Sequence, residues 1–201
     1  MPTAITPSSS DTALANYNSP IGRLTLAARD GALAGLWVAG QRFFGGTYGI
    51  DEAVAHSALD LTSPDSREAV RAAAEWDEAD ALALRAAASW LDGYFAGEAP
   101  SPACVPIAPA GTDFQQRAWA AMDNIPHGAT RTYGQIAATL RGAGVPASAQ
   151  AVGGAVGRNP LLIIRPCHRV VAASGPGGYA AGGDAKAWLL AHEAATASSV
   201  S

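Results

Sequence analysis

Four prolines at positions 100, 102, 106 and 109 constrain this chain more than any other feature of its sequence. Proline has no backbone N–H and a fixed φ, so neither a helix nor a central strand runs easily through such a stretch. We therefore predict a linker at residues 99–111. It would separate an N-terminal domain, 17–98, from a C-terminal domain, 112–201, with residues 1–16 as a disordered tail. A chain of 201 residues can hold two such small domains.

The N-terminal part predicts a strand hairpin followed by a helix. Two apolar runs, 23–28 and 32–38, flank the turn sequence Arg29-Asp30-Gly31, which is typical of a hairpin. Residues 40–78 predict a loop with some helix, including a short helical pattern at 66–76. From residue 78 to 95 apolar side chains recur at spacings of three and four, and Gly97 ends the pattern, which predicts a helix.

The C-terminal part predicts three short helices that resemble a helix-turn-helix. Thr112 or Asp113 can cap the first, whose apolar face runs from Phe114 to Ile125, and His127 in the following turn is expected at the surface. Thr130 or Thr132 can cap the second. The third would run from about 146 to 156, with Ala149, Val152 and Val156 pointing inward.

The third of these helices is built of small residues, and this demands an explanation. Glycine inside a helix costs about 1 kcal/mol relative to alanine. The benefit is that another backbone can approach the helix closely. From these residues alone, that backbone is equally well a protein segment or DNA.

Beyond the third helix, the apolar run 161–164 predicts a buried strand that leads into the Cys167 region. A glycine-rich loop at 175–183 follows, and Asp184 would cap a last helix from 185 to about 195.

Composition excludes several classes of protein. There is no apolar run of eighteen residues, which argues against a membrane span, and the N-terminal residues lack the features of a secretory signal. Two cysteines, Cys104 and Cys167, cannot form a disulfide framework or, alone, a four-ligand zinc site. We therefore expect a reduced, cytoplasmic protein without a metal.

Charge is distributed unequally, although the total is only −4. Residues 1–111 hold six basic and thirteen acidic side chains, whereas residues 112–201 hold seven basic and four acidic ones. Such asymmetry can mark a nucleic-acid-binding part, but it also fits an ordinary solvated surface.

Cys167 is the best candidate for a reactive group. It follows the predicted strand and a proline, and it is flanked by His168 and by the cations Arg165 and Arg169, which would favour the thiolate. Glu193 lies on the apolar side of the last helix and needs a partner there, for which histidine is suited. The plainer alternatives are an inert core cysteine and a surface glutamate. Cys104, in the linker, is expected to be a packed structural cysteine.

The motifs resemble one family strongly. The stretches GTDFQQRAWAAMDNIPHGATRTYGQIAATL (111–140), AVGGAVGRNPLLIIRPCHRVV (151–171), GGYAAGG (177–183) and KAWLLAHE (186–193) look like the O6-alkylguanine-DNA alkyltransferases, or methylated-DNA–protein-cysteine methyltransferases. The likeness covers 111–193 nearly continuously and extends more weakly to 19–22 and 91–97. It implies an α+β protein with a small ribonuclease-H-like N-terminal α/β domain and a helical, winged helix-turn-helix-like C-terminal domain.

The resemblance also implies a function. Such a protein repairs DNA by transferring an alkyl group, usually methyl, from O6-alkylguanine irreversibly to its own cysteine, with O4-alkylthymine as a second candidate substrate. The helix-turn-helix enters the minor groove of double-stranded DNA and the damaged base is flipped out of the stack. No cofactor is implied, each molecule acts once, and a monomer is expected.

Site residues carry over from the family position by position. Cys167 is the nucleophile, His168 and Glu193 form its relay, Tyr133 donates a hydrogen bond to the flipped base, and Asn159 is the hinge. The residues expected to contact DNA are Ala149, Gln150, Ala151, Gly153, Gly154, Arg158 and Arg169. The substrate pocket is expected to involve Val156, Val170, Tyr179 and Ala180.

This chain departs from the family at position 150, where Gln replaces the usual arginine that fills the gap left by the flipped base. An alternative function is that of an alkyltransferase-like protein, which binds alkylated DNA without repairing it. Such alkyltransferase-like proteins lack the reactive cysteine, whereas this chain has one at position 167. A thiol hydrolase would use the same Cys-His pair, but no hydrolase motif accompanies it.

Overall fold

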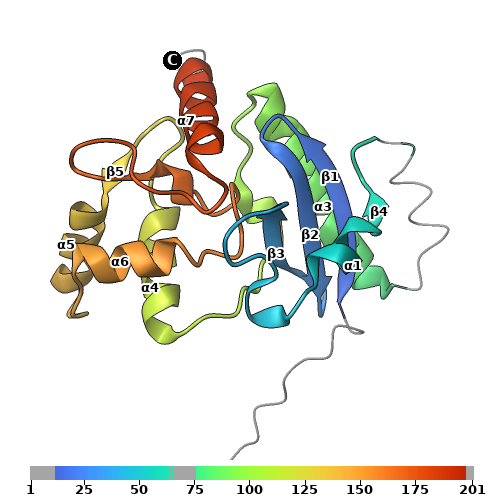
Figure 1. Cartoon of the computed structure of the whole chain (residues 1–201), viewed down its shortest axis with the longest axis horizontal. Helices are drawn as coiled ribbons and strands as arrows, with labels where there is room; N and C mark the ends of the chain where they lie inside the picture. The colour runs from blue at the N-terminus through green and yellow to red at the C-terminus, as the bar shows by residue number, and fades with distance from the viewer. Residues whose placement is uncertain (1–11, 64, 66–75, 198–201) are drawn as a thin grey trace, which may run out of the picture.

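The computed structural model describes residues 12–63, 65 and 76–197, and it has the expected α+β architecture. A small sheet covered by one long helix forms the N-terminal part, and short helices form most of the C-terminal part (Figure 1). The helical pattern expected at 66–76 falls outside the described residues, except for Trp76. No described helix is both long and apolar enough to cross a membrane.

The N-terminal sheet has the strand order β3-β2-β1-β4. The predicted hairpin is confirmed as β2 (Gly22–Arg29) and β3 (Ala32–Val38), which pair antiparallel about the Asp30-Gly31 turn. β1 (Ala13–Ser19) pairs antiparallel with β2, so residues 13–16 are strand and their assignment to the tail was wrong. The reason is burial, because alternate small side chains of this segment lie in the core against β2.

The segment after β3 returns to the free edge of β1. The 3-10 turn η2 (Gly46–Tyr48) and the short helix α1 (Glu52–His56) lead into β4 (Leu59–Asp60), which pairs parallel with β1. Asn16, a buried residue of β1, holds this segment in place. Its Nδ2 donates to the carbonyls of Ala55 at 2.9 Å and Ala58 at 3.0 Å, and its Oδ1 accepts from Thr25.

The long helix α3 (Glu78–Ala96) confirms the predicted helix and covers the sheet. Asp77 caps its first turn, and Gly97 ends it in a left-handed conformation with φ of 87°. Its buried face includes Leu84, Ala87 and Leu91, which pack in the same core as the strands.

The proline-rich stretch runs alongside the outer strand of the sheet. Beyond the 3-10 turn η3 (Pro102–Cys104), Leu33 of β3 donates to Pro106 O at 2.7 Å and accepts from Ala108 N at 3.0 Å. Proline offers no donor, so the pairing stays confined to this point. Cys104 is exposed, which corrects its expected packing.

Three capped helices form the predicted helix-turn-helix region: α4 (Asp113–Asp123), α5 (Tyr133–Gly142) and α6 (Ala149–Val156). Thr112 and Thr132 each build a capping box with the glutamine three residues later. α6 directs Val152, Ala155 and Val156 inward, whereas Ala149 is exposed, contrary to expectation, because it occupies the first, outer turn.

Residues 161–164 are buried but do not form a strand, which corrects the prediction. Only Leu161 bridges to β3, at Leu36, and the chain then turns, with Ile163 at a φ of 68°. The turn leads into the 3-10 segment η4 (Cys167–Arg169) and β6 (Val170–Val171), which pairs parallel with β5 (Arg131–Thr132).

The last helix, α7 (Gly183–Ala197), begins earlier than expected. Asp184 lies inside its first turn and is therefore not the cap. α7 stands between the two halves of the molecule, where α3 and the 163–169 segment both approach it (Figure 1).

We predict that Asn16→Ala destabilises the protein without changing the chemistry of Cys167. The substitution leaves the buried carbonyl of Ala55, the partly buried carbonyl of Ala58 and the Thr25 hydroxyl without their partner, which costs about 1–3 kcal/mol. Urea unfolding measures this loss. An unchanged unfolding midpoint would contradict the role assigned to Asn16.

Candidate active site

Asn159 organises the turn that carries the thiol. Its buried Nδ2 lies 3.1 Å from Leu161 O, 3.0 Å from Arg165 O and 3.1 Å from Cys167 Sγ, and its Oδ1 accepts from Leu161 N. One amide group therefore satisfies the irregular backbone after α6 and contacts the sulfur. The hinge position expected for Asn159 agrees with this geometry.

Cys167 is 3% exposed, at the start of η4. Burial raises the pKa of its thiol to about 11, against the opposing effects of the Asn159 hydrogen bond and the nearby Lys186 charge. At neutral pH the thiol is therefore protonated, and a base is needed to make it nucleophilic.

The two flanking arginines do not activate the thiol, and this corrects the expectation. Arg165 lies over the Trp119 ring, with its Nε 3.2 Å from Asp123 Oδ2. Arg169 turns to Glu193. Side chains point in different directions in the turn that holds Arg165 and in the 3-10 segment that holds Arg169, so closeness in sequence did not produce contact with the thiol.

The cation near the sulfur is Lys186 of α7, which the sequence analysis missed. Its fully buried Nζ donates to Val170 O at 2.7 Å and to Gly178 O at 3.1 Å. Burial lowers the pKa of Lys186, and the Coulombic attraction of the Cys167 thiolate opposes that shift. It is the only lysine of the chain and shares a helix face with Leu189 and Glu193, a spacing that could have revealed it.

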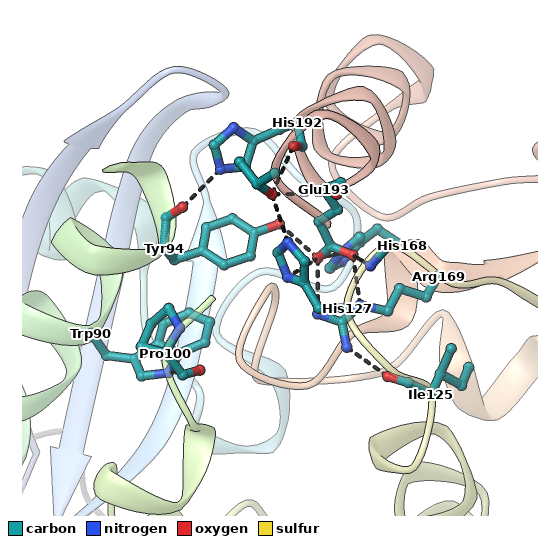
Figure 2. Close-up of polar contacts among 11 residues, drawn as sticks. Trp90, Tyr94, Pro100, Ile125, His127, His168, Arg169, His192 and Glu193 are labelled. Atoms are coloured by element: carbon teal, nitrogen blue, oxygen red, sulfur yellow. Dashed lines mark hydrogen bonds and ion pairs between the residues drawn. The ribbon is translucent and has the colours of Figure 1, made fainter. Parts of the chain in front are cut away.

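Glu193 of α7 is 1% exposed and contacts His168, as expected from the sequence. His168 Nε2 lies 2.6 Å from its Oε1 (Figure 2). Arg169 donates from Nε to Oε2 at 2.8 Å and from Nη2 to Oε1 at 2.9 Å. Burial opposes ionisation, but the hydrogen bonds from His168 and Arg169 outweigh it and hold the pKa of Glu193 well below its usual value.

Three further groups surround this carboxylate. Tyr94 Oη of α3 donates to Oε1 at 2.9 Å, Gly128 N donates to Oε2 at 3.1 Å, and His127 Nδ1 lies 3.8 Å from Oε1 (Figure 2). His127 is thus partly buried in the core of the site and bonded to Thr196, not at the surface as expected.

His168 is fully buried, and burial lowers its pKa although Glu193 opposes that shift. Its Nδ1 makes no hydrogen bond with any described residue. Neutral imidazole, with one nitrogen bound to a carboxylate, can accept a proton at the other.

Arg169, expected to contact DNA, is held inside the protein in this structure. Besides its two bonds to Glu193, its Nη1 donates to Ile125 O at 2.6 Å, so all three nitrogens are engaged inside the protein.

Cys167 lies in a pocket of about 220 Å³. This is smaller than the roughly 300–1,000 Å³ of drug-sized ligand sites. Tyr133, Val156, Tyr179 and Ala180 line it, whereas Val170, expected there, is buried and does not. Arg42 and Phe43, from the loop after β3, also line it and were missed, because no local pattern connects that loop to α6.

The outer face of α6 is open. Ala149, Gln150, Ala151 and Gly154 are exposed, and Gly153 is half-buried. A Cβ added at Gly153 would first meet the Tyr133 ring at 3.9 Å, and one at Gly154 the Arg158 guanidinium at 3.7 Å. No described protein backbone packs against these glycines, so protein packing does not explain the missing side chains at these two positions.

Arg158 is exposed at the end of α6. Its Nη1 donates to Gly154 O at 3.1 Å, and its guanidinium lies 4.9 Å from the Phe43 ring centre. Among the described residues, no group of three or more His, Cys, Asp or Glu side chains is placed to hold a metal ion.

Comparison with known proteins identifies the family. A sequence model described as the DNA-binding domain of 6-O-methylguanine DNA methyltransferase matches residues 113–195. A methylated-DNA–protein-cysteine methyltransferase of Mycolicibacterium paratuberculosis is 39% identical over 177 residues, which are 88% of this chain and 88% of that protein. One of Methanosarcina acetivorans is 50% identical over 108 residues, covering 53% of this chain and 67% of that protein.

Solved structures agree over nearly the whole chain. The crystal structure of Mycobacterium tuberculosis O6-methylguanine methyltransferase matches with a TM-score of 0.64 and 36% identity, covering 92% of this chain and 94% of that one. Mycobacterium tuberculosis OGT in complex with DNA matches with a TM-score of 0.65 and 35% identity, covering 91% and 93%. The chain belongs to the methylated-DNA–protein-cysteine methyltransferase family.

We predict that Lys186→Met moves the Cys167 titration to a pH above the wild-type value, because a cation facing the thiolate is lost. The rate of Cys167 alkylation by iodoacetamide, measured against pH in a Cys104→Ser background, follows the Cys167 thiolate alone. Lys186→Arg keeps the charge and is the matched control. Identical titrations of the Met variant and the parent would refute the assignment.

Proposed function

We propose that this chain repairs DNA by moving an alkyl group from O6-alkylguanine, and from O4-alkylthymine if the pocket admits it, to Cys167. The observation that carries the proposal is a buried thiol in a pocket of about 220 Å³, next in sequence to a histidine held by a buried carboxylate. Family membership supports the same activity.

Double-stranded DNA is the partner, and α6 is the element that enters its minor groove. The open glycine and alanine face of α6 supports close approach to the sugar-phosphate walls. Arg158 extends this surface with an exposed cation. The damaged base leaves the stack and enters the pocket beside α6. Gln150 then lies next to the gap that this base leaves in the DNA.

The transfer reaction needs no cofactor, because the thiol, the histidine and the substrate account for every bond, electron pair and proton. The thiol proton passes through a water to Nδ1 of His168 while Sγ attacks the alkyl carbon opposite O6. The S–C bond forms, the C–O6 bond breaks, and its electrons leave with guanine. Glu193 stabilises the imidazolium, which later returns the proton to the base. Tyr133, which lines the pocket, donates a hydrogen bond to the departing guanine and offsets its charge.

The thioether formed on Cys167 is stable, so each molecule acts once. We further propose that the protein acts as a monomer in the cytoplasm, without a metal.

The first test is transfer of label from DNA that carries labelled O6-methylguanine. We expect label on wild-type protein, none on Cys167→Ala with DNA binding retained, and wild-type labelling of Cys104→Ala, because the Cys104 thiol is exposed and does not line the pocket. DNA bound by the wild type without transfer would indicate an alkyltransferase-like binding protein. Label on Cys104 would overturn the proposal.

Position 150 offers a second prediction, about base flipping, which costs a few kcal/mol in a duplex. Gln150 is shorter than the usual arginine and has no guanidinium to stack on bases or pair with phosphate. Gln150→Arg should therefore speed repair of duplex DNA several-fold and leave the reaction with free O6-benzylguanine unchanged, since the free base needs no flipping.

Arg141 could also act as the wedge, but its Nη1 donates to Ala147 O at 2.8 Å, and it would have to leave this bond to do so. Single-turnover rates on the two substrates decide the matter. Equal acceleration of both, or of neither, would show that position 150 is not the wedge.

A further inference from the structure

We infer that Tyr94, in the N-terminal sheet-and-helix part of the chain, is a positioning residue for the transfer reaction. Its hydroxyl acts through Glu193 and sets both the orientation and the hydrogen-bonding strength of that carboxylate toward His168. This inference rests on the proposed function. It makes the N-terminal part of the chain a contributor to the chemistry at Cys167.

The contact is direct and buried. Tyr94 Oη donates to Glu193 Oε1 at 2.9 Å, and the same oxygen lies 2.6 Å from His168 Nε2. Tyr94 is 1% exposed, so water does not replace the donor. Burial, reinforced by the Glu193 charge, raises the pKa of Tyr94 far above its usual value, so the hydroxyl keeps its proton and remains a donor.

The tyrosine ring is held so that its hydroxyl has little freedom to turn away. Trp90 stacks on it with ring centres 5.2 Å apart, and His127 meets it edge-on at 6.1 Å. Trp90 is itself fixed by its Nε1 bond to Pro100 O at 3.1 Å. Figure 2 shows Trp90 and Tyr94 on one side of the carboxylate and His168 with Arg169 on the other.

α3 also holds α7 through the backbone of the same residue. Tyr94 O lies 2.7 Å from His192 Nε2, one residue before Glu193. Two consecutive residues of α7 are therefore fixed by one residue of α3. The sequence separation is 99 residues for the hydroxyl bond, so no local pattern of the chain anticipates it.

The hydroxyl also affects proton transfer. Glu193 Oε1 accepts hydrogen bonds from Tyr94, His168 and Arg169. Each donor withdraws negative charge from this oxygen and so weakens its hydrogen bonds to the other two. Without the Tyr94 donor, Oε1 stabilises protonated His168 more strongly, which raises the pKa of His168. The histidine must be neutral to accept the thiol proton, so the acidic limb of the rate profile moves to higher pH.

Several other titratable or charged groups lie around His168 and Glu193. Removing the Tyr94 hydroxyl leaves all of them in place, so they do not mask the expected rise in the pKa of His168. From η4 these are Cys167 and Arg169, from α7 Lys186 and His192, from the turn after α4 His127, and from the glycine-rich loop Tyr179.

The test compares Tyr94→Phe with Tyr17→Phe. The Phe ring preserves the packing of Tyr94 and removes only the oxygen. Tyr17 is the matched control because its hydroxyl, also in the N-terminal part, donates to a carboxylate, Asp92 Oδ1, at the same 2.9 Å. Single-turnover transfer from labelled O6-methylguanine DNA is measured across pH, and the His168 ring is titrated by NMR in each variant.

We expect Tyr94→Phe to slow transfer about tenfold, as for other groups that act on a reacting residue through a hydrogen-bonded neighbour. We also expect the acidic limb of the rate profile and the titration of His168 to move to higher pH. Tyr17→Phe should match wild type in rate and in both titrations. A Tyr94→Phe variant that is less stable but has wild-type rate and His168 titration would reduce Tyr94 to a structural residue and overturn the inference. Absence of transfer in the wild type would instead overturn the proposed function.

Discussion

The buried carboxylate of Glu193 is the interaction on which the rest of the structure depends. A buried charge without partners costs several kcal/mol, so the fold must bring donors to it. It does so from α3 with Tyr94, from the turn after α4 with the backbone of Gly128, and from η4 with His168 and Arg169. These elements lie far apart in sequence, and the carboxylate is where they meet.

The same requirement explains why the reactive segment is irregular. Cys167 and His168 are adjacent, and an extended strand would point them to opposite faces. The chain instead turns through 161–166 into a 3-10 segment, and Asn159 supplies the hydrogen bonds that this backbone cannot make with itself. The thiol then lies in the pocket while the imidazole reaches Glu193.

The burial that creates this arrangement also limits reactivity. It raises the pKa of Cys167 to about 11 and lowers that of His168, so the resting pair is neutral thiol and neutral imidazole. A protected thiol suits a protein that can use its sulfur once. In the mechanism that we propose, activation depends on a proton path through His168, so the groups that orient Glu193 would matter beyond stability.

Sequence alone determined what is local or carried by motif: the hairpin, the capped helices, the candidate nucleophile and the Glu193–His168 pair. The sequence did not predict features that depend on packing between residues far apart in the chain. Lys186, and not the adjacent Arg165 and Arg169, is the cation facing Cys167, because side-chain direction in a turn depends on the packing around it. Residues 13–16 became strand because β2 buries them. Tyr94 reached the site because α3 packs against α7, a contact that only the tertiary structure decides.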